Sequence, residues 1–152
     1  MRAAERVRDP LINSILVAFR RFLIPTGRVL WVSEGDSEPT YASRTGLARL
    51  GIRILQPHSL PNVVIFDPKR DFVALVDKAD RPGIMTLKHR EAVTEAFHMC
   101  EFRLISVTAF TNRLECRDSQ LEIPWETFVW FAEEPNHLVY FDGGRLFGPR
   151  GI

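Results

Sequence analysis

Cysteine is scarce in this sequence, and none of it is arranged to bind a metal. The two cysteines, Cys100 and Cys116, are sixteen positions apart, with no CxxC pair and no cluster of histidines beside them. Structural zinc sites combine four Cys or His ligands at short spacings, which this chain does not offer. We therefore expect free thiols in a reducing compartment.

Long apolar runs and an excess of charge are missing too. No apolar stretch approaches the roughly 20 residues that cross a bilayer, and Met1 is followed by the charged sequence RAAERVRD rather than by a signal peptide. Twenty Lys and Arg residues nearly balance nineteen Asp and Glu residues, which gives a net charge of +1. We expect a cytoplasmic protein without membrane contact, and any basic surface for nucleic acid must be local.

What the chain does contain is the composition of an ordinary globular protein. Hydrophobic residues make up 45% and charged residues 26% of its 152 positions, and no repeat or low-complexity segment interrupts them. A chain of this length fits one domain and can bury a substantial core. We expect a single domain over residues 1–152.

The first third of the chain predicts helices on either side of a strand. Asp9 and Pro10 form a helix start, and apolar residues then recur at helical spacing, so we expect a helix over 10–24 with one buried face. The buried stripe comprises Leu11, Ile12, Ile15, Leu16, Phe19, Phe22 and Leu23. A strand over 28–33, a loop, and a short helix that ends at Gly51 follow.

Residues 60–83, LPNVVIFDPKRDFVALVDKADRPG, predict a β-hairpin. Two apolar runs, 63–66 and 72–77, flank the polar turn 67–71. Beyond it we expect a helix over 87–99, strands over 102–110 and 127–132, and a hairpin around Asp142, Gly143 and Gly144. Helices alternate with strands early and strands crowd late, so the predicted fold class is a mixed α/β sheet with helices packed on it.

The hairpin brings Asn62 and Asp77 together at its open end. With the turn centred on Lys69, antiparallel pairing places position 62 opposite position 76 or 77. Acidic groups at two such positions are how metal-dependent nucleases hold a divalent cation against a phosphate. Hairpin geometry alone favours a simpler alternative, in which both residues are solvated strand ends.

Several longer stretches occur in a distinctive order: RVLWVSEGD, LARLGI, LPNVVIFDPKRDFVALVD, SVTAF with Arg113 behind it, and IPWETFVWFAEEPNHLVYFDGGRLFGP. Over residues 15–150 they resemble the catalytic domain of the BsuBI/PstI family of type II restriction endonucleases, a branch of the PD-(D/E)XK nuclease superfamily. The resemblance implies a restriction-endonuclease-like mixed β-sheet flanked by helices. It also implies duplex DNA as the partner, bound by a homodimer or together with a partner subunit.

The same resemblance assigns a site to the open end of the hairpin. In the family, two carboxylates at the positions of Asn62 and Asp77 would bind Mg²⁺, which would activate water for phosphodiester cleavage. The superfamily lysine falls at Ala79; Lys78 is adjacent but points to the opposite face of the strand. The candidate catalytic residues are therefore Asn62, Asp77, Lys78, Lys88 and Arg90, with Asn62 and Asp77 as the metal ligands.

The amide of Asn62 weakens the expected metal site. It keeps one oxygen ligand but removes a full negative charge, and Mg²⁺ depends on charged oxygens to offset its dehydration. Additional negative charge could come from one of four acidic residues: Glu34, Asp36, Asp67 or Asp80.

Other polar and aromatic residues carry weaker expectations. Five basic residues could contact DNA phosphates, although each also fits a solvated surface: Lys69, Arg70, Lys88, Arg90 and Arg113. We expect His137 to be structural. Trp125 and Trp130 should face opposite sides of a strand, one of them in the core.

Two functions follow, from different classes. One is Mg²⁺-dependent cleavage of duplex DNA by a restriction-type endonuclease with a degenerate site. The alternative is a catalytically inactive pseudonuclease that binds DNA or protein within a phage-defence or mobile-element system. A scaffold without nucleic-acid contact is the fallback. Members of the family are longer, with a helical N-terminal region, so we expect either an excised domain or a stand-alone protein that lacks this region.

Overall fold

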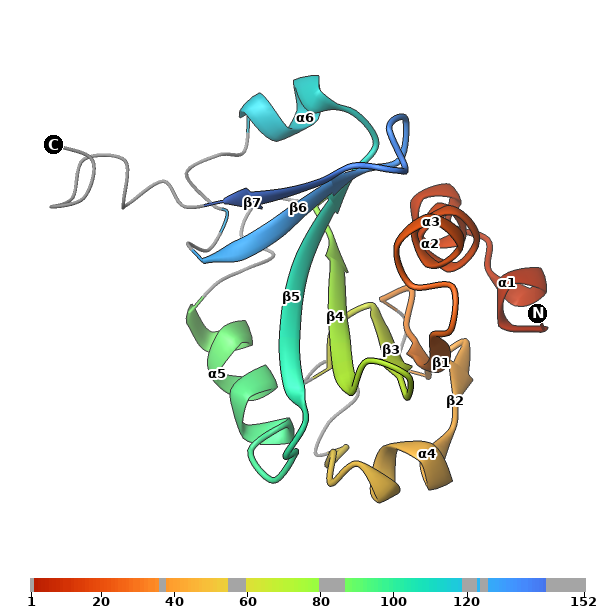
Figure 1. The fold of residues 1–152 in the computed structure, drawn as a ribbon, viewed down its shortest axis with the longest axis vertical. Coiled ribbons are helices and arrows are strands. Elements are labelled where there is room, and N and C mark those ends of the chain that lie inside the picture. Colours follow the sequence, from red (N-terminus) through yellow and green to blue (C-terminus); the bar gives the residue numbers. More distant parts are fainter. Residues whose placement is uncertain are drawn as a thin grey trace, which may run out of the picture.

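A seven-stranded mixed sheet forms the centre of the protein, in the order β2-β1-β3-β4-β5-β6-β7 (Figure 1). The computed structural model describes residues 2–35, 38–54, 60–79, 87–118, 123 and 126–141. The strands are β1 Arg28–Val32, β2 Tyr41–Ala42, β3 Val63–Asp67, β4 Phe72–Lys78, β5 Arg103–Phe110, β6 Thr127–Phe131 and β7 Leu138–Phe141. The pairs β4–β5 and β5–β6 are parallel and the others antiparallel, which confirms the predicted mixed sheet.

The predicted helix over 10–24 is present as three consecutive segments, α2 Pro10–Ser14, η1 Ile15–Phe19 and α3 Arg20–Leu23. The carboxylate of Asp9 caps it by accepting the backbone N–H groups of Leu11 and Ile12, at 2.9 and 3.0 Å. The middle segment is a π-helical turn, in which the N–H of Arg20 donates to the carbonyl of Ile15.

This π-helical turn explains one error in the predicted stripe. Ile12, Ile15, Leu16 and Phe19 are buried as expected, but Phe22 is half exposed. A π turn takes more residues than an α turn, so positions beyond it rotate relative to a regular helical stripe.

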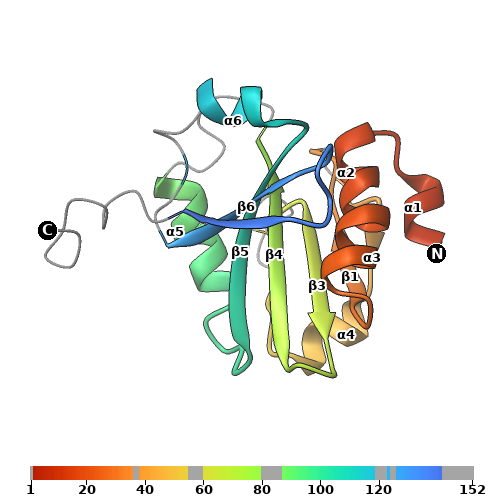
Figure 2. The same cartoon turned by 45° about the horizontal axis from the view of Figure 1, so that its top comes forward.

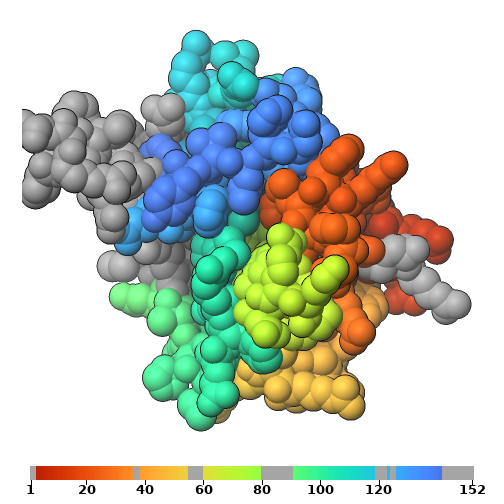
Figure 3. Space-filling view, viewed as in Figure 1, coloured from red at the N-terminus to blue at the C-terminus, as the bar shows by residue number. Residues whose placement is uncertain are grey.

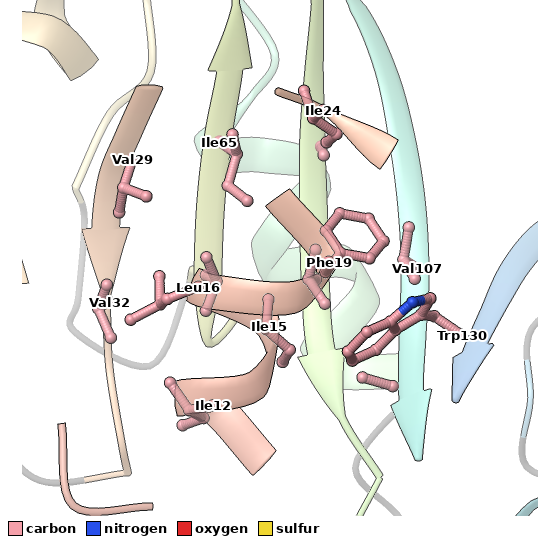
Figure 4. Packing of buried hydrophobic residues seen from close by; sticks show 14 of the residues in the cluster. Ile12, Ile15, Leu16, Phe19, Ile24, Val29, Val32, Ile65, Val107 and Trp130 are labelled. Carbon is pink, nitrogen blue, oxygen red and sulfur yellow. The ribbon is translucent and has the colours of Figure 1, made fainter. Parts of the chain in front are cut away.

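Helices cover both faces of the sheet (Figure 2). On one face, helix residues such as Ile15 and Phe19 pack on Ile65, Val107 and Trp130 (Figure 4). On the other face, Leu47 of α4 (Arg44–Arg49) and Ala96 of α5 (Leu87–Ala96) pack on strand residues. Side chains alternate between the two faces along each strand, so each face of the sheet packs against its own layer of helices.

Smaller elements differ from the expectations. The N-terminal helix α1 (Arg2–Arg6), strand β2 and helix α6 (Arg113–Asp118) were not predicted. Gly51 ends α4 with a φ of 77°, as predicted for a C′ glycine. The hairpin expected around 142–144 lies outside the described residues, and β7 pairs antiparallel with β6. No helix in the described ranges is long and apolar enough to span a bilayer.

The β3–β4 turn is fastened to the helical layer by Asp67. Its side chain is fully buried and accepts hydrogen bonds from Thr26 Oγ1 at 2.6 Å, the backbone N of Lys69 at 3.0 Å and Arg70 Nε at 2.8 Å. Arg70 Nη2 also donates to the carbonyl of Leu23 at 2.7 Å. Burial raises the pKa of Asp67, but the hydrogen bonds outweigh it, and the pKa lies below its usual value of 3.8.

We predict that Asp67→Asn lowers the free energy of unfolding by about 1–3 kcal/mol at pH 7, because it removes charge-assisted hydrogen bonds from a buried group. The depressed pKa stabilises the fold above pH 3.8, and this contribution is lost as the pH falls through the folded-state pKa. The difference between variant and wild type should therefore shrink in acid. Urea unfolding at neutral and acidic pH measures it. The exposed Asp71→Asn is the matched control, and equal stability of the two variants at pH 7 would contradict the assignment.

Candidate active site at the carboxyl ends of the strands

The predicted site lies at the edge of the sheet where β1, β4, β5 and β6 end and β3 begins. These four strands run in the same direction, because β1 and β4 are each antiparallel to β3 and β5 and β6 are parallel to β4. Ser33 follows β1, Asn62 precedes β3, and Asp77 and Lys78 end β4. In open α/β sheets, ligands bind outside the carboxyl ends of strands.

Asn62 and Asp77 are neighbours, as the hairpin register predicted. Val63 pairs with Val76, so Asn62, which precedes Val63, lies opposite Asp77, which follows Val76. The backbone N–H of Asn62 donates to Asp77 Oδ1 at 3.1 Å. The Asp77 side chain is mostly buried, at 7% exposure, and its neighbour on β5, Thr108, is buried too.

The side-chain amide of Asn62 ties three strands together. Its Oδ1 accepts the backbone N–H of Lys78 at 2.9 Å, and its Nδ2 donates to the backbone carbonyl of Ser33 at 3.0 Å. Ser33 in turn donates its backbone N–H to the carbonyl of Asn62 at 2.7 Å. An amide has both the acceptor and the donor that this position requires, whereas an ionised carboxylate only accepts.

Lys78 points to the face of the sheet opposite Asp77, as the strand alternation predicted. Its Nζ lies 2.5 Å from Oδ2 of Asp9, and both side chains are largely buried, at 8% and 21% exposure. Burial raises the pKa of Asp9, but the hydrogen bond from Lys78 and the helix N–H groups outweigh this effect and lower the pKa. The ammonium group thus holds the N-terminus of α2 at the edge of the sheet.

Glu34 extends this network to the loop after β1. Its Oε1 accepts the backbone N–H groups of Arg8 and Asp9, each at 2.8 Å, and its Oε2 accepts Thr40 Oγ1 at 2.6 Å. Burial opposes ionisation, but these hydrogen bonds prevail and lower the pKa of Glu34. Glu34 therefore braces the start of α2 against the sheet.

The other acidic residues considered as extra ligands do not join Asp77 in the described structure. Asp67 is at the opposite end of β3, about 17 Å away at the usual rise per strand residue. At that distance its carboxylate cannot act as a ligand beside Asp77. It fastens the β3–β4 turn instead. Asp36 and Asp80 lie outside the described residues.

The described residues do not by themselves fit a magnesium ion. Among them there is no group of three or more His, Cys, Asp or Glu side chains that could hold a metal. At the predicted position they offer one carboxylate, Asp77, and an amide oxygen that already accepts a hydrogen bond from Lys78. Mg²⁺ binds through carboxylate oxygens, substrate phosphates and retained waters in near-octahedral geometry.

The predicted phosphate-binding residues divide between the two ends of the sheet. Arg113 lies at the carboxyl end, just after β5, where its guanidinium forms a two-pronged contact with Glu134. Lys69 and Arg70 lie in the β3–β4 turn at the far end, where Arg70 pairs with Asp67. The side chains of Lys88 and Arg90 lie outside the part of the chain that the structure describes.

Of the remaining predicted residues, Trp130 is fully buried and stacks edge-on against Phe19, as expected for a core tryptophan. Its Nε1 donates to the carbonyl of Pro135 at 3.0 Å. His137 is exposed and donates its backbone N–H to Glu134. Trp125 lies outside the described residues.

Comparison with known proteins points to one family. Residues 4–144 match the model of the BsuBI/PstI restriction endonuclease domain. The type II restriction enzyme BsuBI of Bacillus subtilis is 31% identical over 91% of this chain, and AplI of Arthrospira platensis is 24% identical over 56% of it. The structure of SdaI restriction endonuclease superposes with a TM-score of 0.76 and 26% identity over 94% of this chain. The matched chain spans 44% of BsuBI, 26% of AplI and 45% of SdaI.

We predict that Asn62→Asp destabilises the fold by about 1–3 kcal/mol at pH 7, because a carboxylate oxygen would face the carbonyl of Ser33 with no proton between them. Protonation restores a donor, so the new carboxyl group should have a raised pKa. The loss of stability should be complete above that pKa and should decrease as the pH drops toward 4. Denaturant unfolding across this pH range provides the measurement. The exposed Asn136→Asp adds the same charge as a control; a pH-independent loss in Asn62→Asp would argue against the three-strand tie.

Proposed function

Because the chain belongs to the BsuBI/PstI restriction endonuclease family, we propose that it is a duplex-DNA-binding, restriction-endonuclease-like domain in which Mg²⁺-dependent phosphodiester hydrolysis is weak or lost. The observation that carries this proposal is the side chain of Asn62. Its amide oxygen and nitrogen are both engaged by the backbone of neighbouring strands. The residue at the position of a family metal ligand thus forms hydrogen bonds that hold neighbouring strands together.

The charge of the site supports the same proposal. When bound, Mg²⁺ would supply a Lewis acid for the phosphate and an activated water. Asp77 is the residue that would hold it, with Asn62 as a neutral second ligand. Lys78, which follows Asp77 in the sequence, is paired with Asp9 on the other face of the sheet, so it is poorly placed to stabilise charge beside Asp77.

A second candidate function is an active nuclease, which the placement of Asp77 favours. This carboxylate stands beside Asn62 at the carboxyl end of a central strand. Asp80 could then complete the metal site, with Lys88 or Arg90 as the cation. In that case Asn62 would be a tolerated substitution, and a homodimer or a partner subunit would complete the DNA interface.

For cleavage, we predict that wild type nicks supercoiled plasmid slowly or not at all with Mg²⁺ or Mn²⁺, and binds these ions weakly by calorimetry. Asn62→Asp should bind metal more tightly because it restores a charged ligand beside Asp77. Nicking should return only in the double change Asn62→Asp with Ala79→Lys, which adds the missing cation as well. Nicking by wild type that Asp77→Ala abolishes would establish the active nuclease. If wild type, Asn62→Asp and the double variant all bind metal no more tightly than an Asp77→Ala control, this end of the sheet is not a metal site.

For DNA binding, we predict that the two basic positions behave differently. Duplex DNA lying along the carboxyl-end edge would meet Arg113 but not Lys69, since the two lie at opposite ends of the strands. Arg113→Ala should therefore weaken binding and reduce its salt dependence, while Lys69→Ala should change neither. Fluorescence anisotropy over a salt series measures both. Lys69→Ala is the charge-matched control at the other end of the strands, and a larger effect of Lys69→Ala than of Arg113→Ala would place DNA on the turn end.

A further inference from the structure

An apolar groove lies on the face of the sheet that η1 and α3 cover, away from the candidate active site. It encloses about 530 Å³ between α3 and β7, above β4, β5 and β6. Leu23 and Leu138 line its sides, and Phe72, Ile105 and Phe128 contribute to its floor. Figure 3 shows this face, where the β3–β4 turn, α3 and β7 surround a hollow. Cavities of this size and lining are typical of ligand sites.

Apolar surface continues from the groove onto β7. Leu138 pairs with Trp130 and Tyr140 pairs with Phe128, so both side chains belong to the same face as the groove. They are 38% and 47% exposed. Strand β7 also ends the sheet, and its outer edge pairs with no other strand among the described residues. Contiguous exposed apolar surface of this kind marks interaction sites.

Three charged residues stand at one end of the groove: Arg70, Asp71 and Arg103. Arg70 is fixed in place by Asp67 and the carbonyl of Leu23, with its guanidinium carbon 5.2 Å from the centre of the Phe72 ring. Arg103 is exposed and forms no ion pair with any residue in the described ranges. The groove thus combines an apolar body with one cation, Arg103, and one anion, Asp71, that form no ion pair in the described ranges.

We propose that this groove docks a peptide segment of a partner protein that presents a large apolar side chain beside a carboxylate. The apolar side chain fills the space between Leu23 and Leu138, and Arg103 binds the carboxylate by a charge-assisted hydrogen bond. Asp71 accepts a backbone N–H of the same segment. This inference does not depend on whether the candidate active site binds metal or cleaves DNA.

The lining favours a peptide over nucleic acid. Nine of the twelve lining residues are apolar and offer no side-chain hydrogen-bonding group for a base edge or a sugar. Asp71 would repel a phosphate, whereas it suits the N–H donors of a peptide. A nucleic-acid track also needs successive cations along a backbone, and this groove has cations at one end.

The test uses the full chain with methyl groups labelled for NMR, and the hexapeptide acetyl-Gly-Asp-Leu-Phe-Asp-Gly-amide as the probe. Titration should give saturable shifts of the Ile105 and Leu138 methyl groups, while Leu47 on the other face stays unchanged. Arg103→Ala should weaken binding about threefold or more, since it removes the charged contact. Arg117→Ala, an exposed cation on α6, should leave it unchanged. A peptide with Asn in place of both Asp residues should also bind more weakly.

Three outcomes would overturn the proposal. The first is a wild-type protein that shows no saturable shift at millimolar peptide. The second is equal binding of the Asp and Asn peptides, or of wild type and Arg103→Ala, which would reduce the contact to nonspecific apolar adsorption. The third is a short duplex DNA that shifts the same methyl groups and displaces the peptide, because that result would assign the groove to nucleic acid.

Discussion

One side-chain amide determines how the carboxyl-end edge of this sheet is built. Asn62 bonds to the backbone of Ser33 on one side and of Lys78 on the other, so it fixes the ends of β1, β3 and β4 relative to one another. The neighbouring contacts follow from this arrangement. With β4 fixed, Lys78 reaches Asp9, and with β1 fixed, Glu34 accepts the backbone N–H groups of the two residues that precede α2. The helix and three strands therefore share one polar network.

The same network sets a conflict between stability and metal chemistry. A donor and an acceptor are both needed at position 62, and an ionised aspartate supplies one of them. A ligand set for Mg²⁺ needs the opposite property, namely a concentration of negative charge. In this chain the structural requirement is met, and the charge beside Asp77 is correspondingly low. Family membership and a full catalytic centre are thus separate questions.

The sequence predicted local features better than distant ones. The register of Asn62 and Asp77 followed from a short turn between two apolar runs, and the family was identified from long stretches in order. The pair of Asp9 and Lys78 was missed because its members are 69 residues apart and each has a sufficient local explanation, as a helix cap and a strand end. The exposure of Phe22 was missed because a π-helical turn leaves no mark in the apolar spacing.

The strand order has a consequence for how the chain folds. The β3–β4 hairpin needs only a short turn, whereas β1 must find β3 across about thirty residues and β4 must find β5 across a similar interval. The entropy cost of closing a loop rises with its length. We therefore expect the hairpin to form first, because its loop is short, and the long-range pairings to form later. The three-strand edge at Asn62 can form only after β1 has docked. The region with the most chemical interest is therefore among the last to be assembled.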